Sequence, residues 1–294
     1  MGLDILAREN LAAWCIVPYD SRRRSPAERA AMLAELGIGA LAWDWREEHV
    51  PSFTEELNAL EEYGVALVAL WCPAVGDADA VPGLVAAAAA RGLAPQLWTC
   101  IEYGPPWQGP PPPDHAERVE HAAAIVEPLA RLGREHGMTV GLYNHMGWFG
   151  EPEHQLGVAD ALAARGFDNV GLVYQQHHGH AHLERWESLW PAIAPRVMAL
   201  GLNGMVPLSV DPRAAMGGPK ISPYGHGTRD VELARVVVES GWKGAVTILG
   251  HTMDDVELRL RDNLEGLDWV RSRLAGTGSA APPAARIATP VWPH

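Results

Sequence analysis

Short apolar runs alternate with longer amphipathic stretches along most of the chain. The runs are hydrophobic on both faces rather than on alternate residues, which is typical of parallel strands covered by helices. They lie at residues 11–17, 39–45, 65–71, 95–101, 138–144, 169–175, 196–202 and 244–250. Helices are predicted between them, at about residues 26–36, 53–63, 80–91, 114–136, 153–165, 181–192, 228–240 and 254–274.

The boundaries of these elements follow one plan. Ser25 is a predicted N-cap, Pro26 takes the first helical position and Gly37 follows the last turn. Eight strand–helix units predict a (β/α)8 TIM barrel, an α/β fold, as a single domain over residues 1–275. An open doubly wound sheet is the alternative, but no glycine-rich nucleotide turn follows the first strand. The Pro/Ala-rich residues 276–294 predict a disordered, flexible tail.

Composition narrows the choice of partners. The chain has 294 residues and a formal net charge of −13, which argues against a nucleic-acid or anionic-membrane surface. No signal peptide and no apolar stretch of transmembrane length is found, so we expect a cytoplasmic protein. The three widely spaced cysteines are expected to be buried thiols rather than disulfides.

Polar residues gather at the predicted strand exits, whereas the strand entrances are Gly, Ala, Val and Pro. In such barrels the active site is built at the carboxyl ends of the strands. Four exit residues are candidates for acid–base catalysis: Asp44, Glu102, His145 and His178. Nine are candidates for substrate binding: Trp45, Arg46, Trp71, Asn144, Trp148, Glu151, Gln175, Asn203 and Lys220. Twelve Trp against three Phe suit a sugar, whose C–H faces stack on aromatic rings.

The stretch "VGLVYQQHHGHAH" (170–182) turns abruptly from a buried strand into glutamines and histidines. With His145 and His251, the histidines at 177, 178 and 180 follow three different strands. Imidazole at such a rim can serve as a general base, a metal ligand or a hydroxyl-binding donor. The histidines predicted on helices are assigned solvated or capping roles instead.

Residues 10–275 resemble the xylose isomerase-like TIM barrels, the sugar phosphate isomerases/epimerases. The resemblance is carried by "LAWDWREEHVPSFTEELNAL", "GLYNHMGWFGEPE", "VGLVYQQHHGHAHLERW" and "PYGHGTRDVELARVVVESGWKGAVTIL". It implies the barrel fold, but it does not select one reaction, because such barrels host isomerases, epimerases, dehydratases, lyases and endonucleases.

The resemblance also implies a divalent metal held by Glu, Asp, His and Glu on strands five to eight. This chain departs from that pattern at all four places, which read Tyr143, Gln175, Gly201 and Leu249. Two hypotheses follow. Either no metal of that type is bound and the acid–base residues act unaided, or a different, histidine-rich site binds Zn²⁺ or Mn²⁺. The residues for the second hypothesis are His145, His178, His180 and His251.

The leading functional hypothesis is a sugar isomerase or epimerase that removes a proton next to a carbonyl. His145 or His178 would be the base, and Asn203 with Arg46 would hold the substrate oxygens. Lys220 lies in a long Gly/Pro-rich connection that is predicted to form a lid. Two alternatives stay open: a lyase or hydratase acting on a keto-glycoside, and a non-catalytic barrel that binds carbohydrate or a partner. A homo-oligomer stays open as well.

Overall fold

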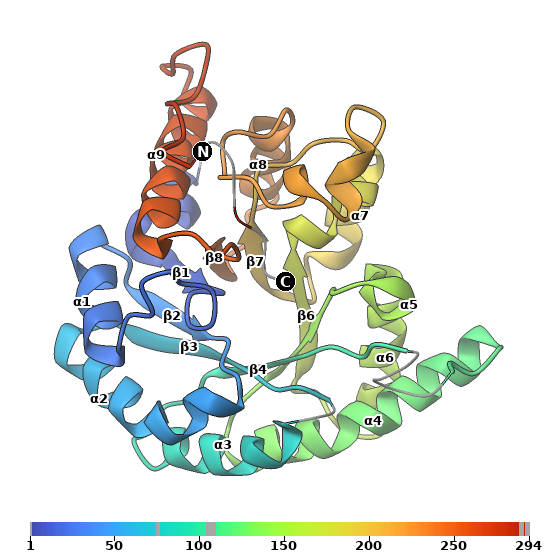
Figure 1. Ribbon diagram of the computed structural model, residues 1–294. Coiled ribbons are helices and arrows are strands. Elements are labelled where there is room, and N and C mark those ends of the chain that lie inside the picture. The colour runs from blue at the N-terminus through green and yellow to red at the C-terminus, as the bar shows by residue number, and fades with distance from the viewer. Residues whose placement is uncertain (1, 75–76, 104–109, 288–290, 292–294) are drawn as a thin grey trace.

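Eight parallel strands close into one barrel (Figure 1). The computed structural model describes residues 2–74, 77–103, 110–287 and 291. The strands are β1 (Leu11–Trp14), β2 (Ala40–Trp43), β3 (Ala66–Trp71), β4 (Gln96–Thr99), β5 (Val140–Tyr143), β6 (Val170–Gln175), β7 (Val197–Leu202) and β8 (Ala245–Leu249). Each strand pairs with the next one in sequence, and β1 closes the ring on β8. The predicted (β/α)8 fold is confirmed.

Helices surround the barrel and connect its strands (Figure 1). They are α1 (Pro26–Leu36), α2 (Phe53–Tyr63), α3 (Val81–Ala89), α4 (His115–Glu135), α5 (Gly147–Gly150), α6 (Pro152–Ala164), α7 (Trp186–Ile193), α8 (Asp230–Glu239) and α9 (Val256–Leu274). Two details differ from the sequence prediction. The segment His180–Arg185 is a 3₁₀ helix ahead of α7, and the single turn α5 interrupts the β5 exit loop.

The predicted caps account for the sharp ends of α1. The Ser25 hydroxyl accepts a hydrogen bond from the Glu28 amide, and the Glu28 carboxylate accepts one from the Ser25 amide. Gly37 ends the helix at φ 71°, a left-handed conformation that glycine adopts without steric cost. Strand β2 begins three residues later, at Ala40, so the connection between α1 and β2 is short.

The C-terminal segment lies beside α9 where the structure describes it. Residues 276–287 and 291 contain no helix or strand, and Arg286 pairs with Asp262 at 2.9 Å and with Glu265. The remainder of the predicted tail, 288–290 and 292–294, lies outside the described residues. Among the helices of the described ranges, none is both long and apolar enough to cross a bilayer.

A buried ion pair joins α1 to α2 and generates a stability prediction. Arg29 and Glu56 form two hydrogen bonds, at 3.0 and 2.7 Å, with side chains only 5% and 1% exposed. Glu56→Ala leaves a buried guanidinium without its partner, so we expect a loss of about 3–5 kcal/mol of unfolding free energy. Replacing both residues, as Arg29→Met with Glu56→Leu, should recover most of that loss. Urea unfolding measures the unfolding free energy of the single and of the double variant.

The exposed pair of Arg131 with Glu127 on α4 (2.9 Å) is the matched control. Arg131→Ala should cost less than about 1 kcal/mol, because water screens that pair. If Glu56→Ala lowered the unfolding free energy by as little as Arg131→Ala, the buried Arg29–Glu56 pair would not have the stabilising role assigned to it.

Candidate active site

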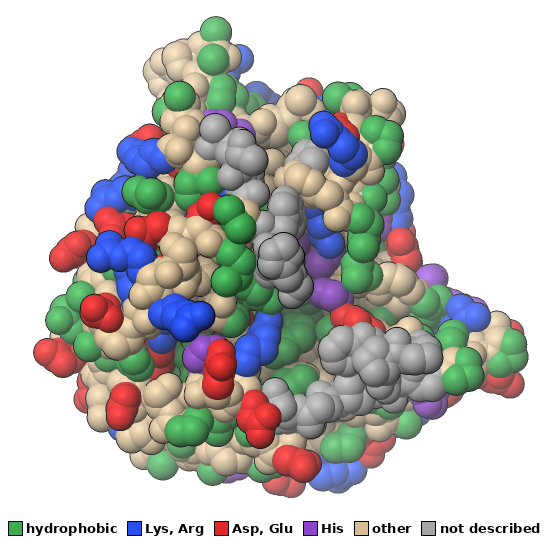
Figure 2. Space-filling model, in the orientation of Figure 1, with side chains coloured by type: hydrophobic (Ala, Val, Ile, Leu, Met, Phe, Trp, Pro, Cys, Tyr) green, Lys and Arg blue, Asp and Glu red, His purple; other side chains and the backbone are tan. Residues whose placement is uncertain are grey.

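A cavity of about 390 Å³ opens at the carboxyl ends of the strands. Figure 2 shows the corresponding hollow near the middle of this face, with histidine and basic side chains at its walls and apolar side chains inside. Its lining comes from seven strand exits: Trp14, Cys15, Tyr19, Asp44, Trp45, Arg46, Trp71, Pro73, Ala74, Cys100, Glu102, Tyr143, His145, His177, His178 and His251. The closed ring therefore brings residues far apart in sequence to a single mouth.

Aromatic rings form the floor of this cavity. Tyr143 packs edge-on against Trp71, with ring centroids 5.3 Å apart, and its hydroxyl accepts a hydrogen bond of 3.1 Å from the Trp14 indole. Trp14 in turn packs edge-on against Trp98 at 5.0 Å. Burial raises the pKa of Tyr143 well above its ordinary value, so the phenol stays neutral. The floor of the cavity is therefore largely apolar.

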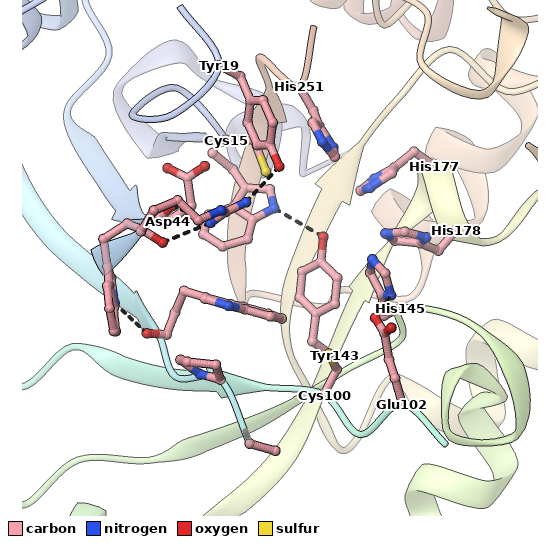
Figure 3. A pocket seen from close by; sticks show the side chains of 16 residues that line it. Cys15, Tyr19, Asp44, Cys100, Glu102, Tyr143, His145, His177, His178 and His251 are labelled. Atoms are coloured by element: carbon pink, nitrogen blue, oxygen red, sulfur yellow. Dashed lines mark hydrogen bonds and ion pairs between the residues drawn. The ribbon is translucent and has the colours of Figure 1, made fainter. Parts of the chain in front are cut away.

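One wall is built from the exits of β1 and β2 (Figure 3). Arg46 donates to the Tyr19 hydroxyl at 2.6 Å and to the backbone carbonyls of Asp44 and Trp45 at 2.9 and 2.8 Å. These contacts fix the guanidinium in place. Cys15, directly after β1, has φ 56°, which is an uncommon conformation for a residue other than glycine. Such a conformation persists only where the surroundings impose it, and active sites are common places for it.

Asp44 is the buried carboxyl group of this wall. Its Oδ1 accepts a hydrogen bond of 3.3 Å from the Val17 amide, while its Oδ2 is buried without a partner in the described residues. Burial, as the largest cause, raises the pKa of Asp44 to about 6, against the opposing effect of Arg46. A carboxyl group with a pKa this close to neutrality can both release and accept a proton.

The opposite wall is a row of imidazoles from β5, β6 and β8 (Figure 3). His145 pairs with Glu102, and its ring centroid lies 4.5 Å from that of His178. His178 lies 3.9 Å from His177, which lies 6.2 Å from His251. Three of these rings have a buried nitrogen without a partner among the described residues: His177, His178 and His251.

Burial decides the charge of these imidazoles. It lowers the pKa of His177 and of His178 well below the ordinary value, and neighbouring histidines and Lys220 lower both further. Burial also lowers the pKa of His251 to about 3. These rings are therefore neutral at pH 7 and keep a free lone pair, which a base or a metal ligand requires.

The structure brings eight of the sequence-predicted residues to the cavity. They are Asp44, Trp45, Arg46, Trp71, Glu102, His145, His178 and His251. Trp45 also donates its indole N–H to the Trp71 carbonyl at 2.7 Å, which ties the β2 exit to the β3 exit.

Four other predicted residues hold the scaffold and do not line the cavity. The Asn144 amide group bonds the backbone of Gln175 at 2.7 and 3.3 Å, which locks β5 to β6. Gln175 itself donates to the Thr247 hydroxyl at 3.3 Å. The ring nitrogens of His180 lie 2.9 and 3.0 Å from two loop carbonyls, and Asn203 donates to the carbonyls of Gly204 and Lys220 at 2.9 Å.

The remaining three predicted residues lie around the rim. Trp148 stacks on His154 at 4.7 Å, and Glu151 pairs with Arg185 at 2.9 Å. Lys220 does not line the cavity, but its positive charge lowers the pKa of Glu102, after the larger effect of the His145 hydrogen bond. The connection that carries Lys220 is held by contacts from Asn203.

Eight lining residues were not among the candidates assigned to catalysis, substrate binding or metal binding: Trp14, Cys15, Tyr19, Pro73, Ala74, Cys100, Tyr143 and His177. Of these, His177 was named from the sequence only as one of the histidines at the rim. Trp14 has the pattern of a core residue, and isolated cysteines carry no spacing signal. One signal was available for Cys100. It stands two residues before Glu102 where β4 ends, and alternate residues of an extended segment point to the same side.

The side chains at the metal positions implied by the family resemblance do not fit a divalent ion. Tyr143 is a neutral buried phenol, Gln175 is an uncharged amide and Leu249 has no donor atom. At Gly201 an added Cβ would lie 1.6 Å from Gln175 Oε1, so the Gln175 side chain fills the space that a histidine would need. These four positions therefore do not supply a ligand set for a divalent ion.

The chain matches solved structures but no family model and no curated protein sequence. The 3-keto-D-glucoside 4-epimerase YcjR from E. coli superposes with a TM-score of 0.63 at 12% identity, covering 89% of this chain and 98% of that one. A D-psicose 3-epimerase, crystallised in the presence of D-fructose, gives 0.61 at 11%, covering 86% and 95%. A xylose isomerase-like TIM barrel protein from Mycobacterium smegmatis, in complex with magnesium, gives 0.57 at 14%, covering 90% and 97%. These likenesses show that the chain shares the TIM barrel fold of these proteins.

The raised pKa of Asp44 generates a prediction about stability. Because the pKa moves from 3.8 to about 6 on folding, the folded protein binds more protons than the unfolded chain between those values. Stability contributed by protonated Asp44 is therefore complete below about pH 4 and is lost as the pH rises through about 6. Asp44→Asn cannot ionise, so we expect it to be about 1–3 kcal/mol more stable than wild type at pH 8. The difference should vanish near pH 4, as measured by thermal and urea unfolding.

Asp160→Asn is the control, because Asp160 has a side chain 66% exposed and is not among the residues that line the cavity. It should leave the pH dependence of stability as in wild type. Equal stability of wild type and Asp44→Asn at pH 8 would contradict the raised pKa.

Proposed function

We propose that this chain is an epimerase- or isomerase-like enzyme that removes a proton from the carbon next to a carbonyl group of a carbohydrate. One observation carries the proposal. Asp44 and His178 stand on opposite walls of the same cavity, and each keeps a buried polar atom without a partner among the described residues (Figure 3). An epimerase needs a proton-transferring group on each face of the reacting carbon.

The floor and the size of the cavity support a sugar. Trp71 lines the cavity and offers an aromatic ring against which the C–H face of a sugar ring can pack. The volume of about 390 Å³ lies within the range of small-molecule sites. Solved structures with the same fold include a 3-keto-D-glucoside 4-epimerase and a D-psicose 3-epimerase, which agrees with this substrate class.

The chemistry follows from the two walls. Neutral His178 takes the proton, and the C–H electron pair moves toward the carbonyl oxygen to give an enediolate. Asp44, in its protonated form, returns a proton to the opposite face of the same carbon as the electron pair moves back, which inverts that carbon. In the reverse direction, ionised Asp44 is the base and protonated His178 is the acid. Arg46 stands in the cavity with its orientation fixed by Tyr19, and it can stabilise the negative oxygen of the enediolate. No change of redox state is required.

Exchange with solvent tests this proposal. Ketohexoses and a 3-keto-glucoside are incubated with the enzyme in D₂O, and deuterium at the carbon next to the carbonyl is followed by NMR and mass spectrometry. We expect exchange with wild type and a loss of at least about 10²-fold in Asp44→Asn and in His178→Ala, because each lacks one proton-transferring group.

His136→Ala is the matched control, because His136 is the C-cap of α4, outside the cavity. It should retain the wild-type rate. Wild-type exchange in both cavity variants, each checked for a folded state, would exclude Asp44 and His178 as the reacting groups. Absence of exchange across the substrate panel would count against the enzymatic assignment.

A further inference from the structure

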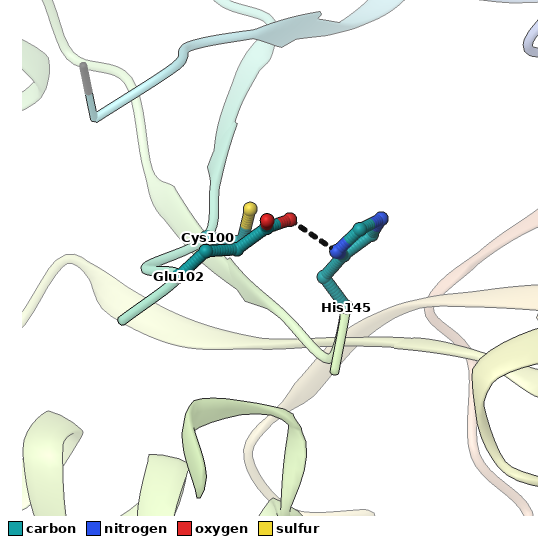
Figure 4. Close-up of side chains that lie close together, drawn as sticks. All are labelled: Cys100, Glu102 and His145. Carbon is teal, nitrogen blue, oxygen red and sulfur yellow. Dashed lines mark ion pairs between the residues drawn. The ribbon is translucent and has the colours of Figure 1, made fainter. Parts of the chain in front are cut away.

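We propose that Cys100, Glu102 and His145 form a binding site for a transition-metal ion, with Zn²⁺ as the expected occupant. The three side chains point toward one another at the edge of the cavity (Figure 4). The site differs from the strand-five to strand-eight positions that do not fit a metal. It also differs from the histidine-rich set predicted from the sequence, of which it contains only His145.

The geometry of the three ligands is that of a compact site. The Cys100 sulfur, a Glu102 oxygen and a His145 nitrogen all lie within 4.8 Å of one another. In a tetrahedral zinc site, with Zn–S near 2.3 Å and Zn–N near 2.1 Å, such atoms lie about 3.6 Å apart. Small side-chain rotations can shorten the ligand–ligand distances from at most 4.8 Å to about 3.6 Å without moving a strand. Among the residues that the structure describes, no other group of three or more His, Cys, Asp or Glu meets this criterion.

The barrel places these ligands just after two paired strands. Cys100 follows β4 directly and Glu102 comes two residues later, so both side chains leave the chain on one side. His145 follows β5, and the pairing of Thr99 with Leu142 sets the two strand ends side by side. Strand pairing therefore brings the three ligands near one another before the ion arrives, which favours affinity.

The donor atoms select the kind of ion. Thiolate, imidazole and carboxylate are the ligands of zinc, whereas Mg²⁺ and Ca²⁺ require oxygen ligands. Three protein ligands leave one position of a tetrahedral ion open, as in catalytic zinc sites. Because all three residues line the cavity, that position is accessible from the mouth. A zinc ion there would supply a Lewis acid beside His178, whose ring lies 4.5 Å from that of His145.

The three ligands must give up their protons before they bind the ion. Burial, as the largest cause, and the neighbouring Glu102 both raise the pKa of the Cys100 thiol, so the sulfur keeps its proton until a cation displaces it. When the ion binds, that proton leaves to solvent and the sulfur electron pair forms the bond to the metal. The proton held between His145 Nδ1 and Glu102 also leaves to solvent, and each of these two residues binds the metal instead. Binding therefore releases protons.

Cobalt substitution tests the site directly and does not depend on turnover. Tag-free protein at pH 7.5 is titrated with Co²⁺ and then with Zn²⁺. We expect one Co²⁺ per chain, intense visible bands of a tetrahedral ion, and a near-ultraviolet thiolate-to-cobalt charge-transfer band that Zn²⁺ abolishes. Cys100→Ser should lose the charge-transfer band, and Glu102→Gln should weaken binding at least tenfold.

Two matched controls accompany these variants. Cys72→Ser changes another buried cysteine at the end of the neighbouring strand, and Glu48→Gln changes an exposed carboxylate with a side chain 80% exposed. Both should bind as wild type does. Circular dichroism checks that each variant is folded, and if Cys100→Ser is not, Glu102→Gln and His145→Ala decide the question.

Failure to bind one Co²⁺ per chain, or a charge-transfer band that persists in folded Cys100→Ser, would overturn the proposal. Because the readout is metal binding, that outcome is separate from a failure of the deuterium-exchange test. If the protein bound the metal but catalysed no deuterium exchange, the metal site would stand and the proposed reaction would not.

Discussion

The pairing of β1 with β8 is the constraint on which the rest of the structure depends. Residues Leu11–Trp14 run in register with Val246–Leu249, which joins the first strand to the last across more than two hundred residues. Only this closure gives all eight strand exits a common mouth. The histidines of β5, β6 and β8 then face the carboxyl group and guanidinium of β2 across an aromatic floor. In an open sheet, the exits of β1 and β8 would lie at opposite edges.

Polar groups at this mouth fall into two kinds. One kind has its hydrogen bonds satisfied by the chain, as Asn144 does on the backbone of Gln175. The other kind keeps buried atoms without partners among the described residues, as Asp44, His177 and His178 do. An unsatisfied buried polar atom costs about 1–3 kcal/mol of folding free energy. Several such atoms surround one cavity, where water or a ligand that enters can supply their missing contacts.

The fold could be predicted from the sequence because it depends on local patterns repeated eight times. Apolar runs, caps such as Ser25 and glycines such as Gly37 each specify their own element. The positions of the strand exits could be predicted for the same reason. The sequence could not show which of the exit side chains enter the cavity, because their orientation depends on partners distant in sequence. Asn203 turns to the Lys220 carbonyl, and His180 turns to the same oxygen from another loop.

The side chain of Gln175 fills the space beside Gly201. An added Cβ at Gly201 would overlap the Gln175 amide, so the two positions are coupled sterically. The atoms in the way are the far end of a flexible side chain, so a residue larger than glycine at position 201 requires the Gln175 amide to turn away from Thr247. The cost of a substitution at position 201 is therefore set by the residue at position 175.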